Sequence, residues 1–145
     1  MLRTLFKSDL NQLLAIEQSV HVVPWTEETF KTCFQAGYIG WVMENVKKIT
    51  GFVMISLRPD ECHVLNICVA RECQHQGIGR KMMEHALQHA KQQGAMIAYL
   101  EVRASNSRAI SLYQKMHFLP IGKRKGYYPM PSGDEDALIF AKNLD

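Results

Sequence analysis

The sequence lacks the features that mark several large classes of protein. Its 145 residues contain no long hydrophobic run that could span a membrane, and residues 1–7 have no hydrophobic core of a signal peptide. The four cysteines form no C-x-x-C pair and no zinc-finger spacing. We therefore expect a cytoplasmic protein with reduced thiols, no bound metal and no association with membranes.

Charge of one sign is also not in excess. The 17 basic and 14 acidic side chains give a net charge of +3, which is too weak and too scattered to predict a nucleic-acid-binding face. Repeats, low-complexity segments and linkers are missing as well. A chain of this length that is 47% hydrophobic and 21% charged predicts one globular domain over residues 1–145.

The first half of the chain combines helical and extended patterns. Residues 1–6 predict a short strand, Ser8 or Asp9 can cap a helix, and Thr26 can cap a second helix. The first of these helices places four apolar residues at helical spacing, namely Leu10, Leu13, Leu14 and Ile16. An antiparallel meander is then predicted from three stretches rich in strand-forming residues, 38–44, 49–57 and 62–70.

The second half changes to a longer helical rhythm. Helical spacing of apolar residues from Gly77 to Gln93 predicts a long helix, which Gly94 ends. A strand over residues 96–102, a helix over 106–117 and a closing hairpin of 118–127 and 137–144, turning around 129–133, follow. Because a helix connects the strands 62–70 and 96–102, these strands should be parallel neighbours. We predict an α+β fold with a mixed, mostly antiparallel sheet flanked by helices.

The loop before the long helix is the first candidate site. Residues 74–80 place Gly77 and Gly79 where the helix begins. The first amides of a helix have no intrahelical acceptor, so such a start can bind a phosphate or pyrophosphate. A glycine-assisted tight turn without a ligand explains the same pattern. The lack of a Gly-Lys-Ser/Thr sequence argues against a P-loop, and the third glycine of a Rossmann motif is missing.

The segment around residues 101–113 is the second candidate site. Glu101 lies near the end of an apolar strand, where a carboxylate is costly unless it is paired, hydrated or functional. Asn106 can cap the next helix, and Tyr113 lies two turns further along the same side. A carboxylate and a phenol could remove and donate a proton. Alternatively, Glu101 forms an ion pair with Arg103 or a neighbouring strand, and Tyr113 is a core aromatic residue.

Together these segments resemble the acetyl-CoA site of the GNAT N-acetyltransferases, and most closely the RimI branch. The matching motifs span nearly the whole chain: His21-x-x-Pro24-Trp25-Thr26, Gln74-x-x-Gly77-x-Gly79, Leu100-Glu101-Val102-Arg103-Ala104-Ser105-Asn106, Leu112-Tyr113, Phe118, Tyr127-Tyr128-Pro129 and Glu135-Asp136-Ala137. RimI enzymes acetylate the N-terminal alanine of a bacterial small-subunit ribosomal protein. The resemblance therefore implies two substrates, acetyl-CoA and the N-terminal tail of such a protein.

The resemblance also implies a role for each matching residue. Glu101 would accept a proton from the attacking amine, and Tyr113 would donate one to the departing thiolate. Amides for the acetyl carbonyl and the pantetheine arm would come from Ile67, Cys68 and Val69. The CoA pyrophosphate would lie against His75, Gln76, Gly77, Ile78, Gly79 and Arg80, and the CoA arm against Asn106. The peptide channel would be walled by Trp25, Tyr127 and Tyr128.

Several alternatives remain open from the sequence. A GNAT enzyme that acetylates lysine side chains or small amines would carry the same acetyl-CoA motifs, and so would a non-catalytic acyl-CoA sensor. A covalent route through Cys68 or Cys73 is disfavoured because neither has an evident histidine and acid partner. The pair His85 and His89 predicts a solvated helix face rather than a metal site.

Two further hypotheses concern partners. The acidic residues 134–136 could receive a basic ribosomal tail, although such a run is most often a solvated hairpin tip. Exposed sheet edges allow a monomer or a weak dimer.

Overall fold

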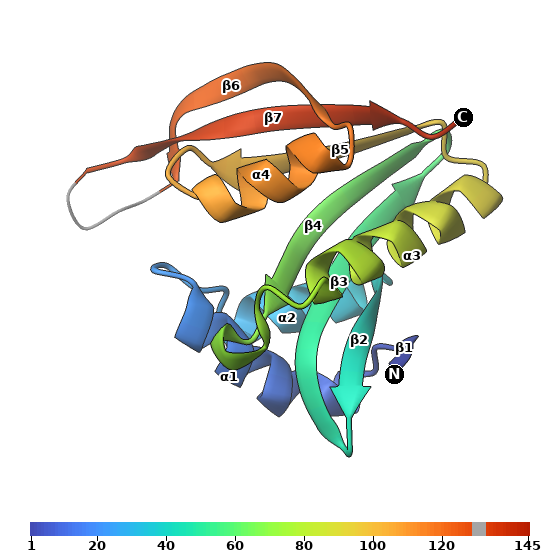
Figure 1. The fold of residues 1–145 in the computed structure, drawn as a ribbon, viewed down its shortest axis with the longest axis vertical. Coiled ribbons are helices and arrows are strands. Elements are labelled where there is room, and N and C mark those ends of the chain that lie inside the picture. The colour runs from blue at the N-terminus through green and yellow to red at the C-terminus, as the bar shows by residue number, and fades with distance from the viewer. Residues whose placement is uncertain (129–132) are drawn as a thin grey trace.

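The fold is built on one mixed sheet of seven strands (Figure 1). The computed structural model describes residues 1–128 and 133–145. The strands lie in the order β1-β2-β3-β4-β5-β7-β6, and all pairs are antiparallel except β4 with β5. Their bounds are β1 Leu2–Thr4, β2 Ile39–Asn45, β3 Lys48–Arg58, β4 Glu61–Val69, β5 Ile97–Arg103, β6 Leu119–Tyr128 and β7 Glu135–Asn143. The predicted α+β class and the predicted parallel pair are confirmed.

Helices cover both faces of the sheet. On one face α1 (Leu10–Val20) and α2 (Glu27–Gln35) enclose a hydrophobic cluster, and on the other α3 (Ile78–Gln92) and α4 (Ser107–Lys115) enclose a second one. The central strand β3 shows this division directly, because Phe52 and Met54 belong to the first cluster and Val53 and Ile55 to the second. A strand covered on both faces has to be apolar along its length, as β3 is.

Three helix starts were predicted from capping residues, and two of them are confirmed. Thr26 Oγ1 accepts a hydrogen bond from the Thr29 amide at 3.2 Å, and Asn106 Oδ1 accepts one from the Ala109 amide at 3.2 Å. The prediction that Ser8 or Asp9 caps the first helix holds for position alone, because Asp9 is the N-cap residue of α1 but forms no side-chain capping hydrogen bond. Its carboxylate is occupied by both Arg3 Nη atoms, at 3.0 Å each, and by the Phe6 amide, so its side chain gives α1 no cap.

A β-bulge separates the two halves of the sheet. In the register of β3 with β4, Met54 faces Asn66 and Ile55 faces Val64, so Leu65 is an extra residue. The parallel pairing of β4 with β5 stops at the same level, at Val64 with Leu100. Because a bulge bends the strand that carries it, β4 turns away from β5 beyond this point. The two strands diverge in Figure 1, and the gap between them positions the candidate site.

The closing hairpin has the predicted strands, and its turn at residues 129–132 lies outside the described residues. Gly126 has φ +63° at a register irregularity of β6, and glycine adopts this conformation without steric cost. Among the described residues, no helix is both long and apolar enough to cross a bilayer.

Candidate active site

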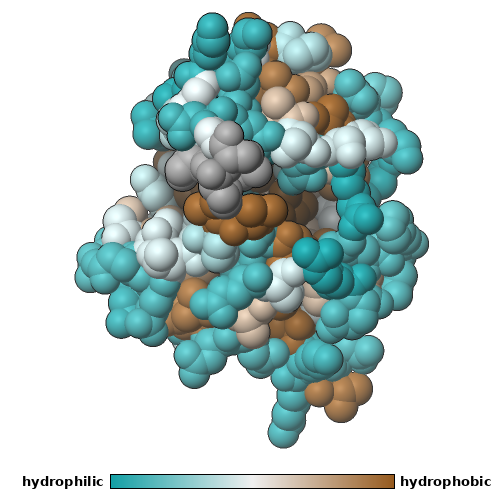
Figure 2. Space-filling model, turned by 90° about the vertical axis from the view of Figure 1, so that its left-hand side faces the viewer, coloured by the Kyte–Doolittle hydropathy of each residue, from teal (hydrophilic) through white to brown (hydrophobic). Residues whose placement is uncertain are grey.

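A cavity of about 310 Å³ opens where β4 and β5 diverge. It is lined by the loop between α1 and α2, by the bulged part of β4, by the end of β5, and by α4 and the end of β6. Figure 2 shows one side of the molecule, where hydrophobic surface gathers near the middle and hydrophilic residues surround it. Of the predicted site residues, six line the cavity: Trp25, Ile67, Glu101, Asn106, Tyr113 and Tyr128.

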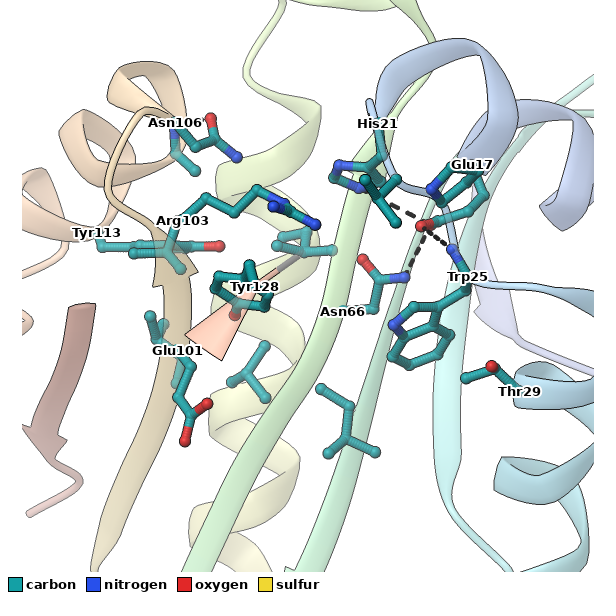
Figure 3. Close-up of a pocket in the computed structure, with 18 of the residues that line it drawn as sticks. Glu17, His21, Trp25, Thr29, Asn66, Glu101, Arg103, Asn106, Tyr113 and Tyr128 are labelled. Carbon is teal, nitrogen blue, oxygen red and sulfur yellow. Dashed lines mark hydrogen bonds and ion pairs between the residues drawn. The ribbon is translucent and has the colours of Figure 1, made fainter. Parts of the chain in front are cut away.

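Tyr113 reaches the cavity from the core between α4 and the sheet. Its side chain is 5% exposed and packs against Phe118 and Phe140, with ring centroids 5.9 and 6.3 Å away. Its hydroxyl points toward the middle of the cavity (Figure 3), and no described residue is hydrogen-bonded to it. Burial raises the pKa of Tyr113 well above its ordinary value, so the phenol stays protonated and can act as a donor. The predicted core position and the predicted access to the site therefore both hold.

Glu101 lies at the opposite side of the same cavity. Alternation along β5 places Glu101 on the face opposite Leu100 and Val102, which belong to the core cluster of α3 and α4. Its Oε1 lies 3.2 Å from Nη2 of Arg124 on β6, the strand beyond its neighbour β7, so Glu101 does form an ion pair, but with neither Arg103 nor an adjacent strand. The carboxylate stays 28% exposed and points away from the Tyr113 hydroxyl in Figure 3. A proton acceptor in this position would reach the amine most readily through water.

The bulged part of β4 carries the three residues predicted to donate amides to the acetyl group and the pantetheine arm. Ile67 lines the cavity, whereas Cys68 and Val69 lie beyond its lining. Because β5 no longer pairs with β4 here, the strand edge at residues 67–69 has no β5 partner. The side chains of Ile67 and Val69 pack toward α3 and α4, and that of Cys68 packs toward α1 and α2.

The predicted pyrophosphate loop lies at the end of β4, outside the cavity lining. Gly77 has φ +79° and precedes α3, so the amides at the start of this helix have no intrahelical acceptor. A Cβ on Gly79 would lie 3.4 Å from Leu112 and 3.7 Å from Val69, which places the start of α3 against α4 and β4. His75 and Gln76 are exposed in the same loop, and Arg80 pairs with Glu84 on the helix surface at 2.9 Å. A ligand held at this loop could therefore extend along α4 into the cavity.

Aromatic residues close the cavity from two sides. Trp25 enters from the loop between α1 and α2 and packs edge-on against Phe30, with ring centroids 5.2 Å apart. Tyr128 enters from β6, and the Arg103 guanidinium lies 4.5 Å from the centre of its ring. Burial and the nearby Glu101 carboxylate raise the pKa of Tyr128 to about 12.

Tyr127, the third residue predicted to wall the peptide channel, lies behind Tyr128. Its side chain is 49% exposed and lies outside the cavity lining. The Tyr127 ring packs edge-on against that of Tyr128, with centroids 5.1 Å apart at a register irregularity of β6, and does not itself reach the cavity lining. It instead contacts Arg124, whose guanidinium lies 5.0 Å from its ring.

Two residues of the site, Glu17 and Asn66, were missed by the sequence analysis. Glu17 is only 2% exposed, and its carboxylate accepts hydrogen bonds from the Trp25 amide and from Asn66 Nδ2. A signal was present, because Glu17 lies four residues after Leu13 on the apolar side of α1. A carboxylate in such a stripe indicates a buried partner.

The cysteines and histidines fit structural roles. Burial raises the pKa of Cys68 strongly and that of Cys62 to about 12, so both thiols stay protonated, which argues against the covalent route through Cys68. His85 is exposed and His89 half-buried on the outer side of α3, in line with the expected helix face, and both rings also pack against Trp41, with centroids 5.2 and 5.1 Å away.

One cluster in the described residues has the composition of a metal site. Glu17, His21 and Cys68 bring one possible ligand atom each within 4.8 Å of one another. Both Glu17 oxygens already accept hydrogen bonds, and a thiol kept protonated by burial is a poor ligand. The expectation of no bound metal remains a prediction.

Two of the three acidic residues at 134–136 have partners within the chain, whereas Asp134 is exposed. Glu135 accepts a hydrogen bond from the Ser105 amide at 3.0 Å and lies 3.6 Å from the Arg103 guanidinium. Asp136 accepts one from the Gly126 amide at 2.8 Å. These carboxylates are occupied within the chain, which argues against the hypothesis that they receive a basic tail.

Comparison with known proteins assigns the family. A model of the acetyltransferase (GNAT) family matches residues 10–118. The [ribosomal protein bS18]-alanine N-acetyltransferase of Escherichia coli K12 is 37% identical over 134 residues, which cover 92% of this chain and 90% of that protein. The protein of the same name from Haemophilus ducreyi is 34% identical over 145 residues, 99% of this chain and 100% of that one.

Solved structures agree. The crystal structure of the ribosomal-protein-S18-alanine N-acetyltransferase from Escherichia coli matches with a TM-score of 0.93 at 34% identity, covering 100% of this chain and 94% of that chain. Arabidopsis thaliana NAA60 in complex with acetyl-CoA matches with a TM-score of 0.86 at 20% identity, over 99% and 97% of the two chains, and shares the fold. This chain therefore belongs to the GNAT family of acetyltransferases, and the predicted resemblance to its RimI branch is confirmed.

Proposed function

We propose that this protein transfers the acetyl group of acetyl-CoA to the N-terminal alanine of a bacterial small-subunit ribosomal protein. The observation that supports this most directly is the cavity between β4 and β5, which brings Glu101 and Tyr113 to one space. The relatives over most of the chain carry the name of this activity. We expect the reaction to take place in the cytoplasm, with the enzyme as a monomer or a weak dimer.

Acetyl-CoA could bind between the start of α3 and the cavity. The start of α3 offers free amides to a pyrophosphate, and Asn106 lines the cavity further in. The edge of β4 at residues 67–69, free of β5, can donate amide hydrogens to the acetyl carbonyl. One such donor to a developing oxyanion is typically worth about 2.7–4 kcal/mol.

The residues of the cavity then supply the proton transfers. A peptide α-amino group has a pKa of about 7.7–8.0, so Glu101 can take its proton through a water at small cost. The free amine attacks the thioester carbon, the nitrogen of the tetrahedral intermediate loses its second proton to water, and the carbon–sulfur bond breaks as the intermediate collapses. Tyr113 donates its hydroxyl proton to the departing thiolate and recovers a proton from solvent. The amine proton on Glu101 leaves in the same way, so no net charge accumulates in the site.

Mass spectrometry of peptides incubated with the protein and acetyl-CoA tests this function. The set contains an alanine-first ribosomal tail, the same tail with a blocked N-terminus, and a lysine-bearing control. One acetyl group on the free alanine terminus alone is the expected result. Acetylation of the blocked, lysine-bearing peptide would instead assign a side-chain acetyltransferase, and modification of no peptide would point to small amines or to acyl-CoA sensing.

The substitution Glu101→Gln separates an enzyme from a sensor. We expect kcat to fall about 100-fold, because the amide cannot accept the proton, while acetyl-CoA binding stays unchanged. The matched control is Glu27→Gln, an exposed carboxylate on α2 that pairs with Lys31 and lies outside the cavity lining. A Glu101→Gln variant with unchanged kcat would remove Glu101 from the mechanism.

A further inference from the structure

We infer that Glu17 and Asn66 act as a pair: Glu17 orients the Asn66 amide so that its Oδ1 faces the cavity and accepts an N–H of the acceptor substrate. The inference rests on the proposed function and adds to it two residues that the reaction scheme does not use. In this pair Asn66 contacts the substrate, and Glu17 is a positioning residue.

The first observation is the burial of the Glu17 carboxylate. It is 2% exposed, and each of its oxygens has a defined partner. Oε2 accepts a hydrogen bond from the Trp25 amide at 2.9 Å, and Oε1 accepts one from Asn66 Nδ2 at 2.8 Å. His21 Nε2 lies 3.8 Å from Oε1. The carboxylate thus connects α1, the loop after it and the bulged part of β4, which together form one wall of the cavity.

The second observation is the direction of the Asn66 amide. An ionised carboxylate offers only hydrogen-bond acceptors, so Asn66 has to turn its NH2 group toward Glu17. Its Oδ1 therefore points to the cavity side, as Figure 3 shows. No described residue donates a hydrogen bond to this oxygen. Asn66 follows the bulge at Leu65 and directly precedes Ile67, so the oxygen lies beside the strand edge assigned to the acetyl group.

The chemistry of this acceptor suits an amine that has to attack in its uncharged form. A carboxylate at position 66 would favour the ammonium form and raise the pKa of the amine. A neutral amide oxygen accepts a hydrogen bond from an N–H group without raising the pKa of the amine. The Glu17 carboxylate is separated from the substrate by the Asn66 side chain. The hydrogen-bond donor to Asn66 Oδ1 is an N–H group at the N-terminus of the substrate peptide. It belongs either to the α-amino group or to the first peptide bond.

A pair of substitutions tests the orientation. In Glu17→Gln, the introduced amide can still accept from the Trp25 N–H but offers its NH2 to Asn66, which then turns its own NH2 toward the cavity. We expect the KM for the alanine-first peptide to rise about tenfold, with the KM for acetyl-CoA and the Tm nearly unchanged. Glu28→Gln, on the exposed part of α2 outside the cavity lining, is the matched control.

Rescue distinguishes orientation from a merely structural role. In Glu17→Gln combined with Asn66→Asp, the introduced aspartate accepts the new NH2 with one oxygen and presents the other to the cavity. We expect the peptide KM to return to within about threefold of the starting protein, with kcat still lowered because the aspartate favours the ammonium form of the amine. Asn66→Asp alone places two carboxylates in contact and impairs activity. An unchanged peptide KM in Glu17→Gln, or no rescue in the double variant, overturns the inference.

The outcome for the proposed function is read separately. If the unsubstituted protein acetylates alanine-first peptides and the Glu17→Gln variant has the same peptide KM, only the inference is refuted. If the unsubstituted protein acetylates only another amine, the proposed function is refuted. The KM of the unsubstituted protein and of Glu17→Gln is then compared for that amine. A peptide with an N-methyl group on its first peptide bond identifies the donor: an unchanged KM assigns the α-amino group, and a KM raised about tenfold assigns the peptide N–H.

Discussion

Replacement of Tyr113 by phenylalanine isolates the proton donor from the packing of its ring. The ring is 5% exposed against Phe118 and Phe140, and these contacts survive in Tyr113→Phe. No described residue is hydrogen-bonded to the hydroxyl, so its removal leaves no protein group without a partner. We therefore expect the free energy of unfolding to change by less than about 1 kcal/mol.

The effect on the rate should be much larger. A positioned general acid typically contributes about 10²- to 10⁴-fold. A thiol has a pKa near 8.5, so the thiolate is a good leaving group and the lower end of this range applies. We expect kcat for an alanine-first peptide to fall about 100-fold, equivalent to roughly 2.7 kcal/mol, with the KM values little changed. Because burial raises the pKa of Tyr113, its ionisation should produce no loss of rate up to about pH 10.

Steady-state kinetics from pH 6 to 10, with thermal melts of each variant, measure both quantities. The control is Tyr99→Phe, a tyrosine on β5 that lies outside the cavity and contacts His63. A kcat for Tyr113→Phe within threefold of the starting value would refute the assigned role. A decline of the rate near pH 9 that disappears in this variant would instead contradict the raised pKa of Tyr113.

Three further predictions follow from particular residues. Gly77→Ala places a Cβ on a residue with φ +79°, which should cost about 1–2 kcal/mol of stability and raise the KM for acetyl-CoA several-fold. The control is Gly94→Ala, at φ +97° beyond the other end of α3, which should lower stability without changing this KM. Asp9→Asn removes one of the two carboxylates that pair with the half-buried Arg3, the other being Glu44, and should lower the free energy of unfolding by about 1 kcal/mol in urea titrations, against less than about 0.5 kcal/mol for the exposed Glu27→Gln. Burial raises the pKa of Cys62 to about 12, whereas the thiol of an unfolded chain titrates near 8.5. The stability that this thiol contributes is therefore fully present below about pH 8.5 and is lost as the pH rises toward 12. Cys62→Ala should make this alkaline loss of stability less steep. An equally steep decline in Cys62→Ala, measured under reducing conditions, would contradict this assignment.

Much of the fold and part of the site follow from local sequence. The helices and strands were predicted because each has its own periodicity, and the caps at Thr26 and Asn106 act over three residues. The positions of Tyr113 on the inner side of α4 and of the glycines at the start of α3 are local in the same sense. The family could be predicted because its motifs are short segments with fixed spacing.

The cavity itself required the tertiary structure. Its opening depends on the register of β3 with β4, where Leu65 is the extra residue, and no local pattern predicts which residue a sheet leaves unpaired. The partners of its charged groups are distant in sequence: Glu17 binds Asn66, 49 residues away, and Glu101 pairs with Arg124 across β7.

Sequence alone thus determined the elements, the family and the reactive residue types, since these depend on neighbours along the chain. The tertiary structure decided which carboxylates are occupied, which tyrosine faces the cavity and which amide oxygen is presented to a substrate. These outcomes depend on strand register and on contacts between segments far apart in the chain, which form only when the sheet assembles.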